Sequence, residues 1–406
     1  MAESAAHRPA DLTGLTALVA EAAAEGRTVE VLGQGSKRGL GRPVEAAQLL
    51  ELSALRGIPM YEPEELVMTA GAGTPLAEVE AELDARGQEL AFEPADYGAI
   101  LGGNPGRQTI GGVFACNLAG PRRLKAGAAR DHLLGLRCVT GRGEAIKAGG
   151  RVVKNVTGYD LCKLLNGSYG TLAVLAEVTF KVMPRAETEA TLLLSGAPEA
   201  DLLAALRRAV ASAHDVSAAA CLPPLAAGRS AALQMAGGSG RALAALRLEG
   251  PEPSVRYRIE RLEAELPGFG FDRLGADESR ALWREIRDLR LLTQNRPLWR
   301  VSLPPTAGSE IAGWAAEFAQ ERLWDWSGGL LWLAPREAWA DAADTVRAAL
   351  AGRGGHATLV RAAEETRRQV PVFEPQPPAL AALTKRVKAS FDPKGILNPG
   401  RMYAGV

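Results

Sequence analysis

Glycines and basic side chains gather in one segment directly after a strand-like run. The segment reads Gly33-Gln34-Gly35-Ser36-Lys37-Arg38-Gly39-Leu40-Gly41. Its glycines let the backbone turn tightly and aim several N–H groups into one concavity, while Lys37 and Arg38 add positive charge. It lacks the G-K-[ST] ending of a Walker loop and the G-x-G-x-x-G spacing of a Rossmann turn. Such a nest suits a pyrophosphate, although glycine-rich turns also connect ordinary strands.

A second segment is rich in small residues. It reads Thr109-Ile110-Gly111-Gly112-Val113-Phe114-Ala115-Cys116-Asn117-Leu118-Ala119-Gly120. Small side chains let a flat ligand approach the backbone closely, and a helix that begins near Gly111 would offer free N–H groups to an anion or a carbonyl oxygen. Tight packing of that helix against a neighbour is the alternative explanation.

A third region combines polar side chains and glycines between a short helix and a strand that runs to Val182. Its two parts are Lys154-Asn155-Val156-Thr157-Gly158-Tyr159-Asp160-Leu161 and Asn166-Gly167-Ser168-Tyr169-Gly170-Thr171-Leu172. Ordinary turn chemistry explains some of this pattern. It does not readily explain three such regions in the first half of one chain.

Cysteines and histidines show no metal-binding pattern. They stand apart along the sequence at Cys116, Cys138, Cys162, Cys221, His7, His132, His214 and His356. Iron–sulfur clusters, zinc sites and disulfide scaffolds need these side chains at close, defined spacing, so none is expected. A reducing compartment is the expected setting.

The elements that must position these segments alternate between strands and helices. The expected elements are a helix over 11–26, strands over 28–32 and 67–70, and a helix over 75–86. Hydrophobic periodicity predicts each of them, and Thr74 is the expected N-cap of the last helix. The alternation as far as Pro184 is an α+β pattern, less regular than a doubly wound sheet.

The texture of the sequence changes near residue 187, where a second domain is expected to begin. We expect strands over 190–194, 217–221 and 231–235, and helices over 199–213, 240–249, 254–266 and 276–290. Trp324, Trp326 and Trp332 lie in strand-like stretches, where core packing is the simplest role and a wall facing a ligand or a partner is the alternative. A proline-rich linker over 371–378 precedes a final helix over 379–391.

The composition excludes several classes of protein. The chain has 406 residues, 47% of them hydrophobic, with 47 Lys+Arg against 47 Asp+Glu. Disordered and fibrous proteins do not have this balance, and a general nucleic-acid binder needs net positive charge. The N-terminus lacks the features of a secretory signal, and no apolar run is long enough to span a membrane, so a cytoplasmic location is expected.

Together the motifs resemble the vanillyl-alcohol-oxidase-type (PCMH-type) FAD-binding family. The resemblance rests on G-x-G-S with basic residues, T-I-G-G-x-x-A-x-N-x-x-G, K-N-x-x-G-Y-D-L with G-S-Y-G-T-L, and D-P-K-G-I-L-N-P-G near the C-terminus, in the family's order. Within the family, Gly120-Pro121-Arg122-Arg123, Arg130-Asp131 and Leu134-Gly135 are most similar to the FAD-binding subunits of glycolate oxidases. The match is strong over 28–184 and at the C-terminus, and general over 187–370.

The resemblance implies a fold and a domain organisation. Residues 1–186 would form a PCMH-type α+β domain of two subdomains that hold an extended FAD. Residues 187–370 would form a ferredoxin-like α+β cap or substrate domain. Residues 371–406 would comprise a proline-rich linker, a helix and a C-terminal tail that returns to the flavin domain.

The resemblance also assigns residues to the cofactor. The pyrophosphate would be wrapped by Gly33, Gln34, Gly35, Ser36, Lys37, Arg38 and Gly39. The flavin would lie against Thr109, Gly111, Gly112 and Asn117, with Pro94 beside the ring and Gly158, Gly170, Leu172 and Val178 in the other lobe. FAD would be bound without a covalent bond, because no histidine occupies a linkage position of the family and Cys116 is more simply a small buried thiol. His132 is more simply an incidental polar residue than a base.

The implied function is that of an FAD-binding subunit of a glycolate oxidase (glycolate/D-lactate dehydrogenase) complex. Its flavin would pass electrons from 2-hydroxy-acid oxidation to an iron–sulfur subunit, beside a second flavin subunit, with any contact to the inner membrane made through partners. The histidine-rich metal motif of related dehydrogenases is absent, so no metal is expected. A cation would hold the substrate carboxylate, and Arg122, Lys154 and Arg401 are candidates, with a surface ion pair as the alternative for each.

Two other functions stay open at this stage. One is a structural subunit that keeps the fold, binds flavin weakly or not at all, and serves as a docking surface. The other is a self-sufficient FAD-dependent 2-hydroxy-acid oxidase.

Overall fold

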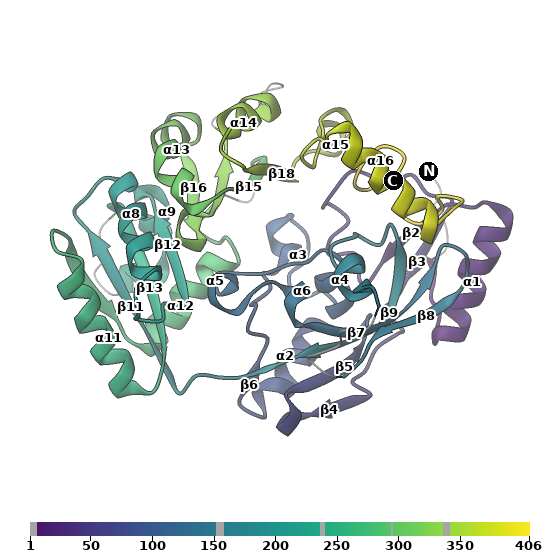
Figure 1. The fold of residues 1–406 in the computed structure, drawn as a ribbon, viewed down its shortest axis with the longest axis horizontal. Coiled ribbons are helices and arrows are strands. Elements are labelled where there is room, and N and C mark those ends of the chain that lie inside the picture. The colour runs from purple at the N-terminus through teal and green to yellow at the C-terminus, as the bar shows by residue number, and fades with distance from the viewer. Residues whose placement is uncertain (1–5, 152–157, 236–239, 294, 336–341) are drawn as a thin grey trace. The chain divides into compact units, whose positions relative to one another are not determined.

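The structure is a computed structural model, and it describes residues 6–151, 158–235, 240–293, 295–335 and 342–406. Its contacts divide the chain into two compact units. The first unit comprises Met1–Ala119, Gly127–Arg185 and Glu364–Val406, and the second comprises Gly120–Ala126 and Ala186–Ala363. The chain therefore enters the second unit twice and ends in the first (Figure 1).

The described part of the first unit contains three sheets. Their strand orders are β1-β3-β2, β4-β5-β9-β7-β8 and β10-β6. The strands are β1 (Ala6–His7), β2 (Val29–Leu32), β3 (Gln48–Glu51), β4 (Met60–Glu62), β5 (Val67–Gly71), β6 (Gln88–Glu89), β7 (Leu133–Thr140), β8 (Ala145–Gly149), β9 (Ala173–Lys181) and β10 (Met183–Pro184). Neighbouring strands are parallel in the first sheet and antiparallel in the other two.

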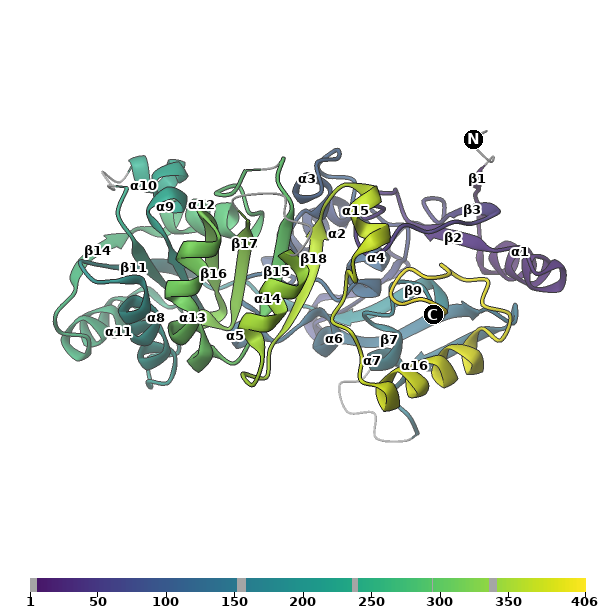
Figure 2. The same ribbon diagram turned by 90° about the horizontal axis from the view of Figure 1, so that it is seen from above.

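Helices surround these sheets. They are α1 (Leu12–Glu25), α2 (Leu76–Asp84), α3 (Tyr97–Ile100), α4 (Ile110–Ala115), α6 (Ala129–His132), α7 (Leu161–Leu165), α15 (Glu364–Gln369) and α16 (Pro378–Phe391), with one 3₁₀ turn, η1 (Pro63–Glu65). Figure 2 shows α16 followed by the extended tail of this unit.

Helix α1 packs on a core that both larger sheets share. It begins after Asp11, whose carboxylate accepts a hydrogen bond from the N–H of Gly14, and it ends at Gly26, which has a φ of 67°. An aspartate N-cap and a left-handed glycine at the C-terminus both stabilise helix ends. Leu15 and Val19 are 0% exposed and pack with side chains of β2, β3, β7 and β9. The predicted helix is confirmed, as are the strands predicted over 28–32 and 67–70, which are β2 and β5.

The predicted N-cap of α2 is wrong. Pro75 occupies the N-cap position and makes no side-chain cap. Thr74 is 0% exposed, and its Oγ1 donates to the Gly57 carbonyl and accepts from the Gly57 N–H, both at 3.0 Å. Because the neighbouring loop offers a donor and an acceptor together, the buried hydroxyl satisfies both there instead of capping the helix.

A buried lysine holds the C-terminal segment in the first unit. Lys388 of α16 donates from Nζ to the carbonyls of Thr171 at 2.6 Å and Leu397 at 2.8 Å, and to Asp392 Oδ2 at 2.8 Å. Asp392 in turn accepts from the N–H of Leu397. Leu397 forms a parallel bridge with Val29 of β2, so the tail lies directly beside this strand.

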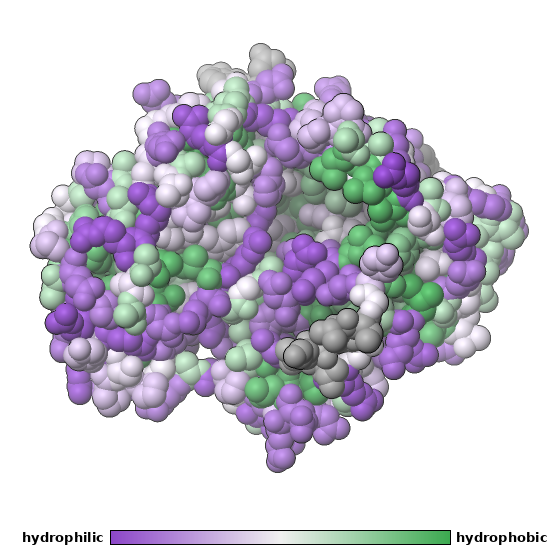
Figure 3. All heavy atoms as spheres, in the orientation of Figure 1, coloured by the Kyte–Doolittle hydropathy of each residue, from purple (hydrophilic) through white to green (hydrophobic). Residues whose placement is uncertain are grey.

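Helix α16 presents hydrophobic side chains to solvent. Leu380 and Leu383 are 47% and 46% exposed and, three residues apart, lie on the same face of the helix. Figure 3 shows hydrophobic residues gathered over this helix. Lys388 is the one side chain of α16 that is buried, so the helix is held to the unit by this polar residue.

Two consecutive β-α-β-β-α-β motifs build the sheet of the second unit. The strand order is β14-β11-β13-β12-β16-β17-β15-β18. The elements are α5 (Arg123–Ala126), β11 (Thr188–Ser195), α8 (Glu199–Val210), β12 (Ala218–Leu222), α9 (Pro224–Arg229), α10 (Ala231–Met235), β13 (Leu243–Gly250), α11 (Glu252–Glu265), β14 (Gly270–Leu274), α12 (Ala276–Arg287), β15 (Leu298–Ser302), α13 (Pro305–Phe318), β16 (Glu321–Asp325), η2 (Trp326–Gly328), β17 (Leu330–Ala334), α14 (Ala342–Leu350) and β18 (His356–Arg361). Numbered within each motif, the strands follow the order 4-1-3-2 and then its mirror, 2-3-1-4. Each motif has the ferredoxin-like topology, so the second unit contains two ferredoxin-like motifs in one sheet.

Two predicted elements of this unit are wrong in type. Residues 231–235 form helix α10 and not a strand, and the helix predicted over 240–249 is strand β13. Alanine and leucine favour a helix in isolation, but β13 pairs with β11 on one side and β12 on the other, and residues 243–248 are all buried. Pairing and burial on both faces of a central strand outweigh local propensity. Trp324 and Trp332 lie in strands as expected, whereas Trp326 begins the turn η2.

The segment that contains α5 belongs to the second unit through its own side chains. Arg122 forms an ion pair with Glu249 at 3.0 Å. The Gly120 carbonyl accepts a hydrogen bond from Trp326 Nε1 at 3.0 Å, and the Arg123 guanidinium lies 4.4 Å from the centroid of the same ring. These partners are more than 100 positions away in sequence, which is why no local pattern predicted the attachment.

We predict that Lys388→Met destabilises the first unit strongly. The substitution leaves the Asp392 carboxylate, which is 0% exposed, without its cation, and breaking a buried pair costs about 3–5 kcal/mol. Urea unfolding measures the change in free energy, and Lys385→Met on the exposed side of α16 is the matched control. Equal stabilities of the two variants would contradict the structural role of Lys388.

Candidate functional site

A slot in the first unit lies where the glycine-rich loop after β2, helix α4 and the C-terminal tail meet. Its cavity volume is about 80 Å³, within a wider hollow of about 630 Å³ that includes open solvent. Its lining residues are Val31, Leu32, Gly33, Gly35, Lys37, Arg38, Leu52, Ala72, Thr109, Gly111, Gly112, Ala115, Cys116, Tyr169, Gly170, Ala173, Leu175, Asn398 and Arg401. Glycine clusters that are far apart in sequence therefore converge on one cavity with apolar walls and a few cations.

Glycines allow the backbone segments of the slot to approach closely. A Cβ atom at Gly33 would lie 2.3 Å from Thr109 Oγ1, and one at Gly111 would lie 2.6 Å from the Ala72 Cβ. Gly35 has a φ of 78°, a left-handed conformation that other residues rarely adopt. Steric contact thus requires glycine at 33 and 111, and the backbone conformation requires it at 35.

The N–H groups at the start of α4 are not free, contrary to the expectation from sequence. The N–H of Ile110 donates to the Thr74 carbonyl and the N–H of Gly111 to the Ala72 carbonyl, both at 3.0 Å. Thr109 caps the helix, with its Oγ1 accepting from the Gly112 N–H. The close packing of α4 on the residues after β5 consumes these donors.

The loop after β2 does offer donors. Within the described part of the chain, the N–H groups of Gln34, Gly35, Ser36 and Lys37 form no hydrogen bond. Consecutive N–H groups in a turn of this kind form an anion-binding concavity. The loop, and not the helix, is therefore the backbone contribution to an anion site.

Buried cations occupy one end of the slot. Lys37 and Arg401 are only 9% and 6% exposed. Arg401 donates to the Lys37 carbonyl at 3.3 Å, and its Nη1 lies 3.6 Å from Glu30 Oε1. The same carboxylate receives two hydrogen bonds from Arg38, at 3.0 and 2.5 Å. Glu30 is thus shared by two guanidinium groups, and Lys37 forms no ion pair with any described residue.

Burial shifts the pKa values of these groups. Desolvation lowers the pKa of Lys37 from 10.5 to about 8, and it also lowers the pKa of Arg401. Burial raises the pKa of the Cys116 thiol, although both cations lie near it and oppose the shift. The thiol of Cys116 is therefore protonated and a weak nucleophile at neutral pH.

Asn398 of the C-terminal tail ties the two sides of the slot together. Its Oδ1 accepts from the Val31 N–H and its Nδ2 donates to the Tyr169 carbonyl, both at 2.8 Å. Asn398 has a φ of 42°, a conformation that asparagine tolerates better than most residues. A Cβ atom at Gly170 would lie 2.8 Å from the same Nδ2, so this crossing also depends on a glycine.

The slot brings together part of the predicted cofactor set. Lining it are Gly33, Gly35, Lys37, Arg38, Thr109, Gly111, Gly112 and Gly170. Outside its lining lie Gln34, Ser36, Gly39, Pro94, Asn117, Gly158, Leu172 and Val178. Val178 is 0% exposed in the middle of β9, and Gly158 is exposed to solvent.

The structure describes two of the three candidates for a carboxylate-binding cation, and they belong to different units. Arg122 belongs to the second unit, where Glu249 pairs with it, and Arg401 lines the slot of the first unit. Lys154 lies outside the described residues. His132 is 1% exposed and its ring lies 5.1 Å from the Phe92 ring, as in a hydrophobic core.

Sequence reasoning missed several polar residues of the site. Asn398 and Tyr169 line the slot, although only the N-P-G and G-S-Y-G patterns hinted at their turns. Outside the lining of the slot, Asn166 and Gln108 are buried, and the Asn166 side-chain amide and Gln108 Oε1 form no hydrogen bond with any described residue. Such unpaired groups arise from long-range packing, which no local pattern reveals.

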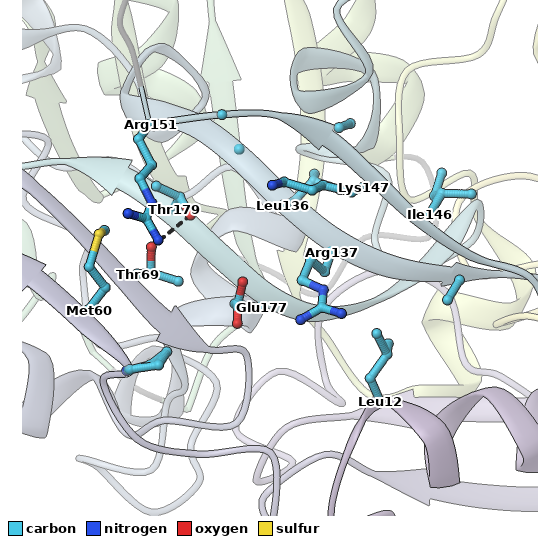
Figure 4. Close-up of a pocket in the computed structure, with 15 residues that line it drawn as sticks. Leu12, Met60, Thr69, Leu136, Arg137, Ile146, Lys147, Arg151, Glu177 and Thr179 are labelled. Atoms are coloured by element: carbon cyan, nitrogen blue, oxygen red, sulfur yellow. Dashed lines mark hydrogen bonds between the residues drawn. The ribbon is translucent and has the colours of Figure 1, made fainter.

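A second hollow of the first unit lies on a polar face of the five-stranded sheet (Figure 4). Thr69 and Thr179 share a hydrogen bond at 2.8 Å there, between β5 and β9. Arg137 lies between Glu177 of β9 and Lys147 of β8 in the sheet register. None of the glycine clusters of the slot reaches this hollow, which is therefore separate from the predicted cofactor site.

Neither a metal site nor a membrane span occurs in the described part of the chain. No group of three or more histidine, cysteine, aspartate or glutamate side chains there could hold a metal ion. The cysteines are all free thiols. Over the same residues, none of the helices combines the length and the apolar character needed to cross a membrane.

Sequence comparison places the chain among flavin enzymes. The family described as "FAD binding domain" matches residues 4–149, and "FAD linked oxidases, C-terminal domain" matches residues 372–402. The chain is 37% identical over 379 residues to the glycolate oxidase subunit GlcE of Escherichia coli (strain K12), covering 92% of each protein. The chain belongs to the GlcE family. Its cofactor is FAD, as the matched FAD binding domain indicates.

Other relatives of this GlcE family member match a smaller part of it. The glycolate oxidase subunit GlcD of Bacillus subtilis (strain 168) is 34% identical over 151 residues, which are 37% of this chain and 30% of that protein. Among solved structures, 4-ethylphenol oxidase from Gulosibacter chungangensis superposes with a TM-score of 0.71 and 13% identity, covering 98% of this chain and 89% of that one. p-Cresol methylhydroxylase superposes with a TM-score of 0.69 and 14% sequence identity, covering 99% of this chain and 88% of that one. The GlcE family member therefore has the PCMH-type fold.

The slot fits the chemistry of FAD in this GlcE family member. A dinucleotide needs apolar walls for flat rings and donors for a diphosphate, and the slot offers both. Arg401 Nε is buried and forms no hydrogen bond with any residue that the structure describes. Native proteins rarely leave such a donor unpaired unless a ligand or water accepts the bond.

We predict that Gly35→Val prevents retention of FAD. A β-branched residue is strained at a φ of 78° and its side chain would disturb the loop that carries the free N–H groups. Gly87→Val is the matched control, because Gly87 has a φ of 63° but does not line the slot. The flavin absorbance of the purified variants measures retention; stoichiometric FAD in Gly35→Val would show that the loop does not bind the cofactor.

We also predict that the burial cost of Lys37 depends on pH. Because its folded-state pKa is about 8 and its unfolded value is near 10.5, the unfolded state alone holds the proton between these pH values, and stability rises with pH in that window. Below pH 8 the cost is present in full. Urea unfolding of FAD-free protein should thus show Lys37→Met gaining more stability over the unsubstituted chain at pH 7 than at pH 10. A constant difference would contradict the buried environment of Lys37.

Proposed function

We propose that this chain is the FAD-binding subunit of a glycolate oxidase (glycolate/D-lactate dehydrogenase) complex. Its FAD, bound without a covalent bond, accepts or relays electrons from 2-hydroxy-acid oxidation and passes them to an iron–sulfur subunit. The observation that carries the proposal is the convergence of the glycine clusters on one slot, in a chain that is 37% identical to GlcE along 92% of its length.

Residues of the slot support the non-covalent mode of binding. Bound FAD supplies a two-electron acceptor that can return electrons singly. The loop 33–39 holds the diphosphate with its N–H groups, while Thr109, Gly111 and Gly112 leave room for the rest of the molecule. Cys116 lines the slot, but its raised pKa keeps the thiol protonated, so it does not attack a flavin.

The chain is poorly equipped to oxidise a 2-hydroxy acid by itself. Proton abstraction from the hydroxyl needs a base, and a carboxylate needs a cation that is not already paired. Arg122 is neutralised by Glu249, and His132 packs against Phe92 in a core. These contacts favour a relay role, with the second flavin subunit of the complex carrying the substrate chemistry.

Electrons leaving the chain need an external acceptor. Among the described residues, no group of three or more cysteine, histidine, aspartate or glutamate side chains could hold a metal ion, which argues against an iron–sulfur cluster in this part of the chain. An iron–sulfur subunit is the acceptor that we propose. The exposed leucines of α16 support the alternative in which the chain serves mainly for docking, and a self-sufficient oxidase is the third function.

Reconstitution with FAD tests the proposal. We predict that the purified chain binds FAD in a one-to-one ratio, giving absorbance at about 450 nm, and that acid precipitation releases the yellow colour into the supernatant. Released colour demonstrates a non-covalent cofactor; colour that stays in the pellet contradicts it. A chain that stays colourless after incubation with FAD favours the docking function.

Anaerobic addition of substrate then separates relay from self-sufficient catalysis. Glycolate or D-lactate should leave the flavin of the isolated chain oxidised and should bleach it in the complex purified from the native host. Bleaching of the isolated chain would show that it is an oxidase on its own. An iron assay of the purified complex tests the acceptor.

A further inference from the structure

The hollow on the five-stranded sheet of the first unit is lined by more cations than anions. Its cavity volume is about 500 Å³, and Arg137, Lys147 and Arg151 lie around it (Figure 4). None of these three side chains forms an ion pair or a hydrogen bond with another described residue. Glu177 supplies the carboxylate of the lining. The hollow therefore carries excess positive charge.

The sheet register holds two of these cations opposite each other. Arg137 of β7 pairs with Lys147 of β8 on one side and with Glu177 of β9 on the other. Directly opposite residues of an antiparallel ladder share one face of the sheet, and like charges there are destabilising. Glu177 forms no ion pair with any residue that the structure describes, so it does not relieve the repulsion through direct contact. An anion in the hollow compensates both cations at once.

Two buried hydroxyl groups lie on the same face. Thr179 is opposite Gly135, two positions from Arg137 along β7, and Thr69 is opposite Thr179. Both threonines line the hollow and are only 6% and 8% exposed, and their Oγ1 atoms share a hydrogen bond at 2.8 Å. That bond uses one of the two hydroxyl protons, and no described residue accepts the other. One nearly buried donor thus remains for a ligand.

Apolar side chains complete the lining. Leu12, Met60 and Ile146 border the hollow beside the charged residues. A cavity of this size suits a small organic molecule, whose body meets apolar side chains while a few polar groups orient it. A phosphate ester brings about two negative charges at neutral pH and three acceptor oxygens. Guanidinium groups match such oxygens with paired donors.

We propose that this hollow binds a small organic phosphate at a site separate from the FAD slot. Arg137 supplies the paired donors, Lys147 and Arg151 supply further charge, and the Thr69–Thr179 pair supplies a neutral donor. The inference goes beyond the proposed function and does not depend on it, because the linings of the hollow and of the slot have no residue in common.

Titration calorimetry of the FAD-saturated chain tests the site, because bound FAD keeps other ligands out of the slot. The probes are adenosine monophosphate (AMP), inorganic phosphate, adenosine and a polyglutamate peptide. We predict that AMP binds and adenosine does not. Arg137→Gln should weaken AMP binding about 10-fold, and Lys147→Gln should weaken it about 3-fold. Glu177→Gln should tighten it about 3-fold, because it removes a repulsive carboxylate.

Controls separate binding from folding. Arg86→Gln changes an exposed arginine of the same unit outside the lining of the hollow, and it should bind AMP like the unsubstituted chain. The urea midpoint of each variant shows whether the fold persists. A loss of structure does not tighten binding, so Glu177→Gln carries the result should Arg137→Gln destabilise the sheet.

The probes also identify the ligand chemistry. Inorganic phosphate that binds as tightly as AMP would support the site and assign recognition to the phosphate group alone, whereas tighter AMP binding would support it with a contribution from the apolar lining. Adenosine that binds as tightly as AMP would overturn the proposal. A polyglutamate peptide that displaces AMP and binds more tightly would also overturn it, and would assign this face to an acidic protein segment.

The remaining outcomes separate this inference from the proposed function. Absence of binding by AMP and phosphate would overturn the site, as would an AMP affinity that is unchanged in both Arg137→Gln and Glu177→Gln. A chain that does not bind FAD would overturn the proposed function alone. AMP is then titrated into the FAD-free chain, where binding in the hollow should fall in Arg137→Gln and not in Lys37→Met; the reverse pattern would overturn the site.

Discussion

The close contact of helix α4 with the loop after β2 and with the residues after β5 is the constraint on which the site depends. Gly33 meets Thr109, and Gly111 meets Ala72, at distances that admit no side chain. This contact closes one side of the slot, but it also occupies the N–H groups at the start of α4. A helix N-terminus normally provides part of an anion site. Here the packing that builds the slot removes that contribution, so charged side chains must replace it.

The C-terminal tail supplies what the packing removes. Asn398 links the end of β2 to the segment before β9, Lys388 anchors the tail to Thr171, and Arg401 reaches the loop. These contacts join residues that lie more than 200 positions apart, so the slot is complete only when the end of the chain has folded onto its beginning. Contacts of such sequence separation form late in folding, because closing the intervening chain costs entropy. The tail contacts therefore connect the slot to the completed fold of the first unit.

The sequence predicted local features well and tertiary ones poorly. Helix α1 and the strands β2 and β5 follow from patterns among residues that are neighbours in the chain. Residues of β13 were predicted to be helical, because the strands β11 and β12 that pair with them are distant in sequence. Thr74 was predicted to cap α2, but its hydroxyl bonds to Gly57 instead. The two ferredoxin-like motifs share no repeated sequence, so the sequence did not indicate that the motif occurs twice. The same order of strands and helices can arise from unrelated sequences. In the site, glycine patterns indicated the loop, whereas Asn398 and the orientation of Arg401 depend on contacts across the whole chain.

Burial of the cations in the slot carries an energetic cost. Lys37 loses hydration on burial, as its lowered pKa of about 8 shows, and Arg401 Nε is left without an acceptor. A ligand that brings an acceptor and negative charge removes both costs at once, whereas a neutral ring system removes neither. Apolar walls alone favour any flat molecule of suitable size, whereas buried cations favour a ligand that carries negative charge.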